Sequence, residues 1–389
     1  MKREHPKTVL ALNSGSATIK FALYRGSRQI VRGQIERISL SDSSFQYTEL
    51  GKKPVTIRYA DGIRDHHEAI QLVLGQIGLL GEKIRVIGHR VVHGGRDYTK
   101  ATLVSSPVYK KLQKISALAP LHNPANLAGI QACRNMLPAV PNVAVFDTGW
   151  FAGLDPAVAY YSIPLEIQEK YHIRRYGFHG ISHQSAAKEA ARRIGRPLKK
   201  LNMVSCHLGS GCSVTAIRQG KAFDTSMGFT PLEGLTMSTR SGDIDPAAVL
   251  YLLRQPGWNV EKVETLLTRE SGWKGVSGIS ADFRDVLSAA GWTVPGYATR
   301  KKYSGERKRR AKLAVDMFIY DVQRYIGAYI SRLGHVDAVI FTGAIGERNA
   351  TVRRMILAPY RLPSRTKVLV IPADEEKAIA QAALHSVRS

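Results

Sequence analysis

The same succession of strand, loop and strand occurs twice in this chain, far apart in the sequence. An apolar run meets a small Gly/Ser loop at residues 13–16 and a second apolar run follows, and the pattern returns around the loop at 209–211. A turn glycine, Gly26 or Gly220, follows each loop at the same interval. Two copies of this pattern predict a duplicated domain. A cleft between two such halves can hold a polyphosphate from both sides.

The loops allow two interpretations. Small residues expose backbone N–H groups and let an anion approach them closely, which is typical of phosphate-binding loops. Lys20, just past the first loop, can add a point charge. When residues 13–16 are taken alone, an ordinary hairpin with a tight turn explains them equally well. The recurrence at 209–211 favours phosphate binding.

Length and composition indicate a soluble protein with two domains. A chain of 389 residues suits two domains of ordinary size, and its 44% hydrophobic and 22% charged residues are typical of globular proteins. No apolar run is long enough for a membrane span or a signal-peptide core. The cysteines, Cys133, Cys206 and Cys212, are scattered and odd in number, which fits neither a disulfide framework nor a metal site. We therefore expect a cytoplasmic protein.

The net charge of +25 raises the question of an anionic partner. Residues 300–310 concentrate seven of the basic side chains in one short segment, and such a run can bind nucleic acid or an anionic surface. No aromatic stacking pattern or nucleic-acid motif accompanies it, so a solvated loop leading into a helix is the favoured interpretation. We expect neither a nucleic-acid nor a membrane partner, although the positive field attracts small anions.

Two charged residues stand within or at the end of apolar runs. Arg90 lies in the run 85–92, where an arginine is costly to bury unless it meets an anion; a structural ion pair and a substrate contact explain it equally well. Asp147 ends the run 143–147, where parallel sheets collect acidic side chains. A helix cap is the commoner role of a lone aspartate in such a place.

Other segments combine glycine with polar residues. His179 is bracketed by glycines, although a lone histidine is more often structural than catalytic. Segments 223–234 and 236–246 are rich in Gly, Ser, Thr and acids and have the character of active-site loops. Residues 312–333 show helical periodicity, and the strand 336–341 then opens into a Gly-rich turn at 342–347, a third nucleotide-type element.

Together these motifs resemble the acetate kinase family, which also includes propionate and butyrate kinases, along essentially the whole chain. They are NSGS at 13–16 with Lys20, HRVVHGG at 89–95, LHNP at 121–124, FDT at 146–148, YGFHG at 176–180, HLGSG at 207–211, TRSGD at 239–243, DFR at 282–284 and FTGAIGE at 341–347. The resemblance implies an α/β fold of duplicated ribonuclease-H-like domains with a central cleft, as in actin-like ATPases. We expect residues 1–149 with 376–389 to form one domain and 150–375 the nucleotide-binding other.

The resemblance also implies roles for individual residues. Catalytic roles fall to Asp147, His179 and Arg240, the last two stabilising the transferring phosphoryl group. The carboxylate substrate is bound by Arg90 and its alkyl end is walled by Val92, Leu121, Phe178 and Pro231. Nucleotide binding is implied for Lys20, His207, Leu208, Gly209, Ser210, Gly211, Asp282, Phe283, Arg284, Ala344, Ile345, Gly346, Glu347 and Arg348. Asn13 and Glu375 are implied to hold Mg²⁺, directly or through water.

The resemblance implies a homodimeric, Mg²⁺-dependent enzyme that moves phosphate reversibly between ATP and acetate. Alternatives are a propionate or butyrate kinase, an acetate kinase that uses pyrophosphate or another donor, and a non-catalytic nucleotide-binding module. The second alternative arises because Ser210 replaces the usual asparagine, and residues 343–348 replace the usual Ala-Gly-Ile-Gly-Glu-Asn. Retention of a carboxylate site argues against the third alternative.

Overall fold

A computed structural model describes residues 7–120, 122–297 and 303–387. It divides into two compact units, Met1–Ala152 with Asp374–Ser389, and Gly153–Ala373. The sequence predicts boundaries at 149/150 and 375/376. The first unit instead runs to Ala152 and resumes at Asp374, so it includes Glu375. Leu121 and residues 300–302 of the basic run lie outside the described residues.

The first unit is built on an eight-stranded sheet in the order β5-β4-β3-β2-β1-β6-β8-β7. Its strands are β1 (Thr8–Ser14), β2 (Thr18–Arg25), β3 (Arg28–Glu36), β4 (Ser43–Glu49), β5 (Val55–Tyr59), β6 (Val86–Val91), β7 (Thr102–Leu103) and β8 (Asn142–Phe146). Its helices are α1 (His66–Leu79), α2 (Ser106–Ile115), η1 (Ser116–Leu118), α3 (Asn123–Met136), η2 (Gly149–Phe151) and α14 (Glu375–Ser386).

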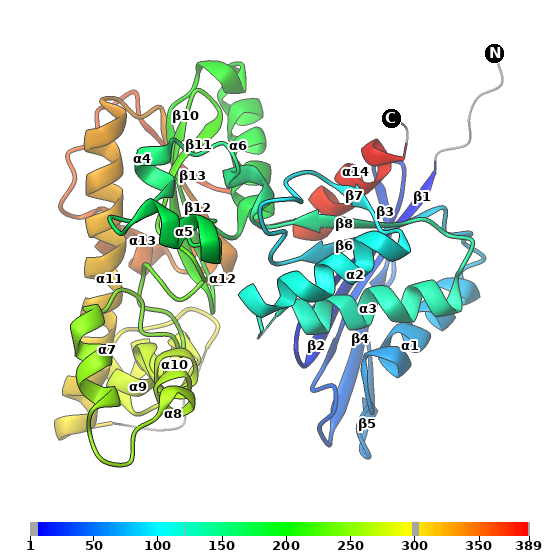
Figure 1. The fold of residues 1–389 in the computed structure, drawn as a ribbon, viewed down its shortest axis with the longest axis horizontal. Helices are drawn as coiled ribbons and strands as arrows, with labels where there is room; N and C mark the ends of the chain where they lie inside the picture. Colours follow the sequence, from blue (N-terminus) through cyan, green and yellow to red (C-terminus); the bar gives the residue numbers. More distant parts are fainter. Residues whose placement is uncertain (1–6, 121, 298–302, 388–389) are drawn as a thin grey trace. The chain divides into compact units, whose positions relative to one another are not determined.

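Strand alternation divides the two faces of this sheet. Leu10 and Leu12 of β1 join a core cluster with residues of α1 and α3. On the other face, Gly88 of β6 lies under α14, where an added Cβ would come within 2.9 Å of the side chains of Ile379 and Ala383. The glycine lets α14 pack directly on the strands (Figure 1). Residues of β1 and β6 in phase with Gly88, Arg90 among them, therefore project toward the side covered by α14.

The second unit has a five-stranded sheet in the order β11-β10-β9-β12-β13. Its strands are β9 (Met203–Leu208), β10 (Cys212–Arg218), β11 (Lys221–Thr225), β12 (Ala338–Thr342) and β13 (Lys367–Val370). Its helices are α4 (Pro156–Ala159), α5 (Leu165–Tyr171), α6 (Gly180–Ile194), η3 (Leu198–Lys200), α7 (Pro246–Leu253), α8 (Val260–Thr265), η4 (Leu266–Glu270), α9 (Gly272–Ser277), α10 (Phe283–Ala290), α11 (Gly305–Leu333), α12 (Gly343–Arg348) and α13 (Ala350–Leu357).

Helix α11 connects two parts of the second unit. One end packs with α9 and α10, where Phe318 meets Trp273 and Phe283 in an aromatic cluster, and the other packs on the sheet (Figure 1). The predicted helix 312–333 is confirmed and begins earlier, at Gly305. The basic run thus enters a helix, and Arg310 donates hydrogen bonds to the carbonyls of Gly275 and Val276 at the end of α9.

The two sheets share one topology. In the first, β1 is antiparallel to β2, β2 is antiparallel to β3, and β1, β6 and β8 run parallel. In the second, β9, β10 and β11 repeat the antiparallel part and β9, β12 and β13 the parallel part. The turn glycines Gly26 and Gly220 both have positive φ, 61° and 75°. The predicted duplication is confirmed, and the fold is the duplicated α/β architecture expected. Among the described residues, none of the helices is long and apolar enough to cross a bilayer.

Candidate active site

Polar side chains from three parallel strands meet at one edge of the first unit's sheet. Asn13 lies near the end of β1, Arg90 near the end of β6 and Asp147 directly after β8, because parallel neighbours bring their carboxyl ends to the same edge. Glu375, the first residue of α14, completes the group. Arg90 Nε and Nη2 donate to Asp147 Oδ2 at 3.0 and 2.5 Å, and Arg90 Nη1 donates to Asn13 Oδ1 at 3.2 Å.

Arg90 is the cation that faces the carboxylates of Asp147 and Glu375 in this group. The Asp147 side chain is 1% exposed and the Arg90 side chain 19%, so each needs the other to remain charged. Burial acts to lower the pKa of the Arg90 guanidinium, but the charges of Asp147 and Glu375 outweigh it and raise the pKa above its ordinary value. Arg90 is therefore a permanent cation whose contacts with Asp147 and Asn13 use only part of its N–H donors.

Glu375 brings a second carboxylate to the group. Its Oε2 accepts a hydrogen bond from Asn13 Nδ2 at 3.2 Å and lies 3.9 Å from Arg90 Nε. Burial, and then the charge of Glu375, raise the pKa of the neighbouring Glu376, and the charge of Lys20 opposes that rise. Carboxylate and amide oxygens in a locally negative environment are ligands that Mg²⁺ prefers. Within the described ranges, the protein does not gather three or more His, Cys, Asp or Glu side chains into a metal-binding group.

The second predicted loop, residues 209–211, lies beside other candidate phosphate-binding groups of the second unit. It joins β9 to β10, and Gly209 N–H donates to Gly211 O at 3.1 Å. A Cβ added to Gly211 would lie 3.3 Å from both Cε1 and Nε2 of His179 and 3.8 Å from Nη1 of Arg240. The bare Cα of Gly211 thus faces both side chains, so the structure brings loop 209–211, His179 and Arg240 together.

His179 is held in an uncommon conformation. It has φ 58° and ψ 23°, the left-handed region that only a few per cent of non-glycine residues adopt, at the start of α6. Its ring stacks on that of His207 with centroids 4.3 Å apart, and its Nδ1 is 2.9 Å from Ser213 Oγ. Strained residues of this kind gather at functional sites, where the surroundings over-determine them.

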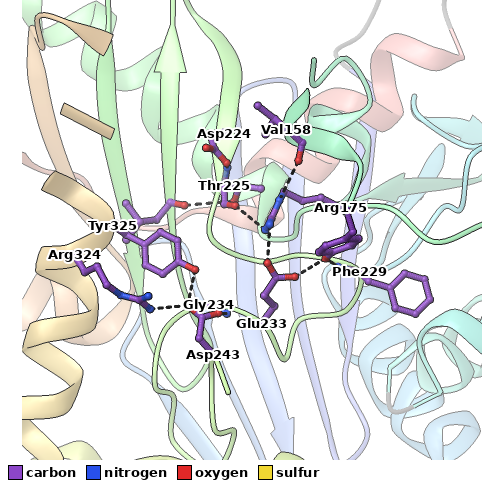
Figure 2. Close-up of polar contacts among 12 residues, drawn as sticks. Val158, Arg175, Asp224, Thr225, Phe229, Glu233, Gly234, Asp243, Arg324 and Tyr325 are labelled. Atoms are coloured by element: carbon purple, nitrogen blue, oxygen red, sulfur yellow. Dashed lines mark hydrogen bonds and ion pairs between the residues drawn. The ribbon is translucent and has the colours of Figure 1, made fainter. Parts of the chain in front are cut away.

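Arg240 belongs to a loop whose two ends are joined by hydrogen bonds between Gly234 and Asp243. Arg240 Nη1 donates to Pro231 O at 3.1 Å. Gly234 and Asp243 bond each other, since Gly234 N–H donates to Asp243 Oδ1 and Asp243 N–H to Gly234 O. Arg324 and Tyr325 of α11 hold the other oxygen of Asp243, at 2.6 and 2.9 Å (Figure 2).

A second ion pair supports the segment that contains Pro231. Arg175 Nη2 donates to Glu233 Oε1 at 2.6 Å, and other Arg175 nitrogens donate to the carbonyls of Val158 and Thr225 (Figure 2). Tyr161 donates its hydroxyl proton to the second oxygen of Glu233 and accepts from Phe229 N–H. Two charged networks therefore fix both flanks of the loops that carry Pro231 and Arg240.

Comparison with known proteins shows the family of this chain. Residues 8–363 match the model of the Acetokinase family. The chain belongs to the acetokinase family. An acetate kinase of Caldicellulosiruptor saccharolyticus is 41% identical over 96% of this chain and 98% of its own. Among solved structures, a Porphyromonas gingivalis acetate kinase has a TM-score of 0.85 at 32% identity, covering 98% and 100% of the chains. A Francisella tularensis propionate kinase has a TM-score of 0.87 at 34% identity, covering 97% and 99%.

The remaining predicted residues lie on several elements of the two units. Val92 follows β6 in the first unit and is 6% exposed, whereas Phe178, 1% exposed, and Pro231 belong to the second. Asp282 caps α10 and pairs with Arg284, while the side chain of Phe283 packs inside the aromatic cluster with Trp273. His207 and Leu208 end β9, and Ala344, Ile345, Gly346, Glu347 and Arg348 form α12 after Gly343.

Glu347, predicted to contact the nucleotide, also holds two backbone segments together. Its Oε1 accepts from the N–H groups of Gly343 and Ala373, both at 2.8 Å. Gly343 has φ 77°, and a Cβ there would come within 3.0 Å of the backbone of Leu208. The turn between β12 and α12 therefore needs glycine at 343 and is tied down by Glu347.

Two asparagines that hold the backbone beside the candidate site were not singled out by sequence reasoning. Asn126 Oδ1 accepts from Val92 N–H at 3.0 Å and its Nδ2 donates to Ser14 O at 2.5 Å. Asn123 bonds both the N–H and the carbonyl of His93. Both are almost fully buried in the first turns of α3. The sequence signal available was two asparagines three residues apart near the start of one helix.

Proposed function

We propose that this protein transfers the γ-phosphoryl group of ATP to acetate, giving acetyl phosphate and ADP, and catalyses the reverse reaction. A carboxylate oxygen of acetate attacks the γ-phosphorus, and the oxygen that bridges the β- and γ-phosphorus atoms leaves with ADP. The observation that carries the phosphoryl-transfer assignment is the convergence of His179 and Arg240 on Gly211 in a phosphate-type loop. The relatives' names support acetate as the acceptor.

The chemistry demands positive charge more than a base. Two anions must approach each other, and charge spreads over the phosphoryl oxygens in the transition state, so preorganised donors supply most of the acceleration. His179 and Arg240 serve as those donors. A carboxylate needs no deprotonation to act as a nucleophile. Asp147, buried against Arg90, therefore acts as an electrostatic organiser.

Arg90 is the proposed carboxylate contact, since a guanidinium matches the planar geometry of a carboxylate. Val92, Phe178 and Pro231, with Leu121, are the proposed walls for the methyl group. Loop 209–211, α12 and the start of α10 are the proposed nucleotide contacts.

Mg²⁺ fits the residues present in the first unit. Asn13 and Glu375 offer oxygen ligands beside Glu376, a further carboxyl group whose pKa is raised first by burial and then by the charge of Glu375. When bound with the nucleotide, the ion would neutralise charge on the phosphates.

The test is acyl-phosphate formation trapped with hydroxylamine. Purified protein is supplied with ATP, Mg²⁺ and, in separate reactions, acetate, propionate or butyrate. We expect acetohydroxamate with the highest kcat/KM for acetate. Higher kcat/KM for propionate would make this chain a propionate kinase, and no hydroxamate with any acid would refute the proposal.

We further propose that the enzyme is a cytoplasmic homodimer that associates through α7. This helix is almost wholly apolar, yet none of its residues is buried, and Leu250 and Tyr251 are 53% and 63% exposed. Exposed apolar patches of this kind mark association sites. The three free, buried cysteines are those of a reducing compartment. Leu250→Asp should lower the mass measured by light scattering from dimer to monomer, whereas Leu79→Asp, at an exposed leucine of α1, should not. A monomeric wild-type protein would refute the dimer.

A further inference from the structure

Three histidines and three serines form a connected group in the second unit, where α6 packs on the sheet. Hydrogen bonds link His179, Ser213, His183 and Ser205 in one chain. A separate hydrogen bond links Ser182 to His207, whose ring stacks on that of His179. Ser205 and His207 are two residues apart in β9 and so share a face, and Ser213 of β10 is the register partner of His207. Local strand geometry therefore presents this polar face to the first turn of α6.

One serine hydroxyl links two of the histidine rings. Ser213 Oγ lies 2.9 Å from His179 Nδ1 and 2.7 Å from His183 Nε2, and His183 Nδ1 lies 2.8 Å from Ser205 Oγ. A hydroxyl carries a single proton, so Ser213 donates to one ring while it accepts from the other. The proton positions on His179 and His183 are therefore coupled.

The coupling influences whether Nε2 of His179 carries a proton. When Ser213 donates to Nδ1, the neutral His179 ring carries its proton on Nε2, the atom that lies 3.3 Å from the Cβ position of Gly211. When Nδ1 is itself protonated, Ser213 turns its proton toward His183; a cationic His179 then still presents Nε2–H, whereas the neutral Nδ1–H tautomer presents a bare Nε2. In both arrangements the hydrogen bond at Nδ1 fixes the ring plane.

His183 follows either arrangement without adding charge. Its side chain is completely buried, and burial, followed by the charge of His207, lowers its pKa well below the ordinary value. A neutral imidazole donates at one nitrogen and accepts at the other, and can exchange the two roles. Ser205, on its far side, accepts or donates accordingly.

We propose that Ser213 and His183 are positioning residues for phosphoryl transfer: through the Nδ1 hydrogen bond they hold His179 with Nε2–H directed at the transferring group. The proposal rests on the function proposed above. The residues act through His179, whose left-handed backbone already restricts where its ring can point.

Steady-state kinetics of three variants test this. Ser213→Ala should lower kcat about 10-fold or more, because a misdirected donor stabilises the transition state poorly. It should leave both KM values within about 2-fold, since Ser213 is fully buried. Ser213→Thr keeps the hydroxyl and should retain most of the activity. Thr215→Val is the matched control: it removes a buried hydroxyl two residues along β10 that bonds Thr225, and should leave kcat unchanged. Equal losses in Ser213→Ala and Thr215→Val, or no loss in Ser213→Ala, would overturn the proposal.

Nitrogen chemical shifts of ¹⁵N-histidine-labelled protein give a measurement that needs no turnover. With signals assigned through His179→Gln and His183→Gln, wild-type protein at pH 6 should show a neutral His183 and a hydrogen-bonded Nδ1 on His179. A cationic His183 or a solvent-exposed His179 Nδ1 would refute the network even if Ser213→Ala failed to fold. If wild-type protein forms no acetyl phosphate, the proposed function fails separately, and these shifts still decide whether Ser213 holds His179.

Discussion

Arg90 and Arg240 are held by different hydrogen-bond partners. Arg90 is locked to the buried carboxylate of Asp147 and bonds Asn13, so its charge is compensated before any substrate arrives. Arg240 donates to the carbonyl of Pro231 and lies beside the bare Cα of Gly211, as a cation at a phosphate-type loop. A cation of this kind suits the charge that develops on a transferring phosphoryl group.

Two arginine substitutions separate these roles. Arg240→Ala should lower kcat on the order of 10²-fold or more. Arg90→Lys keeps a charge beside Asp147 but loses the planar fork, and should chiefly raise the KM for acetate. Steady-state kinetics check both, with Arg254→Ala, an exposed arginine after α7, as the control. Near-wild-type constants for both variants would remove them from the site.

Val92 tests the proposed substrate wall. Val92→Ala removes bulk from a 6% exposed position, and a change of about one methylene alters discrimination by roughly 10- to 200-fold at most. The ratio of kcat/KM for propionate to that for acetate should therefore rise. An unchanged ratio would place the wall elsewhere.

Some site residues were predictable one at a time because strand ends have a local signature. Arg90 and Asp147 stand out as charges within or after apolar runs, and the glycines around His179 mark a turn. The partners that hold them were not predictable in the same way. Asn126 joins Ser14 to Val92, and Glu233 joins Arg175 to Tyr161, through side-chain contacts between segments far apart in sequence. No local pattern encodes such contacts.

At the scale of elements, the alternation of residues in β6 decides which side chains face the core. His89 lies 1% exposed and bonds Asn142 at 2.7 Å, and His93, after the strand, is fully buried. Burial lowers the pKa of each to about 4. Both histidines are therefore neutral in the folded protein at neutral pH.

These histidines predict acid-sensitive stability. Each folded-state pKa lies below the unfolded value of about 6.5, so stability is complete above that pH and falls as the pH decreases toward 4, because the unfolded chain binds the extra protons. Each contributes a loss on the order of 2–3 kcal/mol by pH 4. Thermal unfolding between pH 7 and 4.5 should show a shallower decline in His89→Gln than in wild type. The exposed His172→Gln should keep the wild-type slope, and equal slopes in all three proteins would contradict the assignment.

The loop 209–211 and α12 carry the departures from the usual family sequence. Ser210, Ala344 and Arg348 are all exposed on these elements. Because Ser210 is shorter than asparagine, we predict the loss of one phosphate-loop hydrogen bond worth about 0.5–1.5 kcal/mol, and we expect the methyl group of Ala344 to occupy space beside the proposed nucleoside contact. The double variant Ser210→Asn, Ala344→Gly should lower the KM for ATP about 2- to 10-fold relative to GTP and pyrophosphate. Ala350→Gly, at the start of α13, controls for helix propensity. A wild-type protein that already has a low, adenine-selective KM for ATP, unchanged in the double variant, would contradict the prediction.

At the scale of the whole molecule, the duplicated fold distributes the proposed chemistry over both units. The residues proposed to bind the carboxylate and Mg²⁺, Arg90, Asn13 and Glu375, belong to the first unit, and His179 and Arg240 belong to the second. The duplication itself was predictable, because two loop-and-turn patterns at equal spacing are visible in the sequence. The helical additions α7 to α10 were not, since nothing in the first half corresponds to them. The net charge of +25 supports the attraction of anionic substrates to both units.

The central claim is direct attack of acetate on the γ-phosphorus, and oxygen labelling tests it most directly. Acetate labelled with ¹⁸O in both carboxylate positions is incubated with ATP, Mg²⁺ and the protein, and the product is observed by ³¹P NMR. We predict that the phosphorus signal of acetyl phosphate carries the isotope shift of one directly bonded ¹⁸O, because the bridging oxygen comes from acetate. An acetyl phosphate signal without that shift would contradict the account, since all four oxygens on phosphorus would then have come from ATP or water.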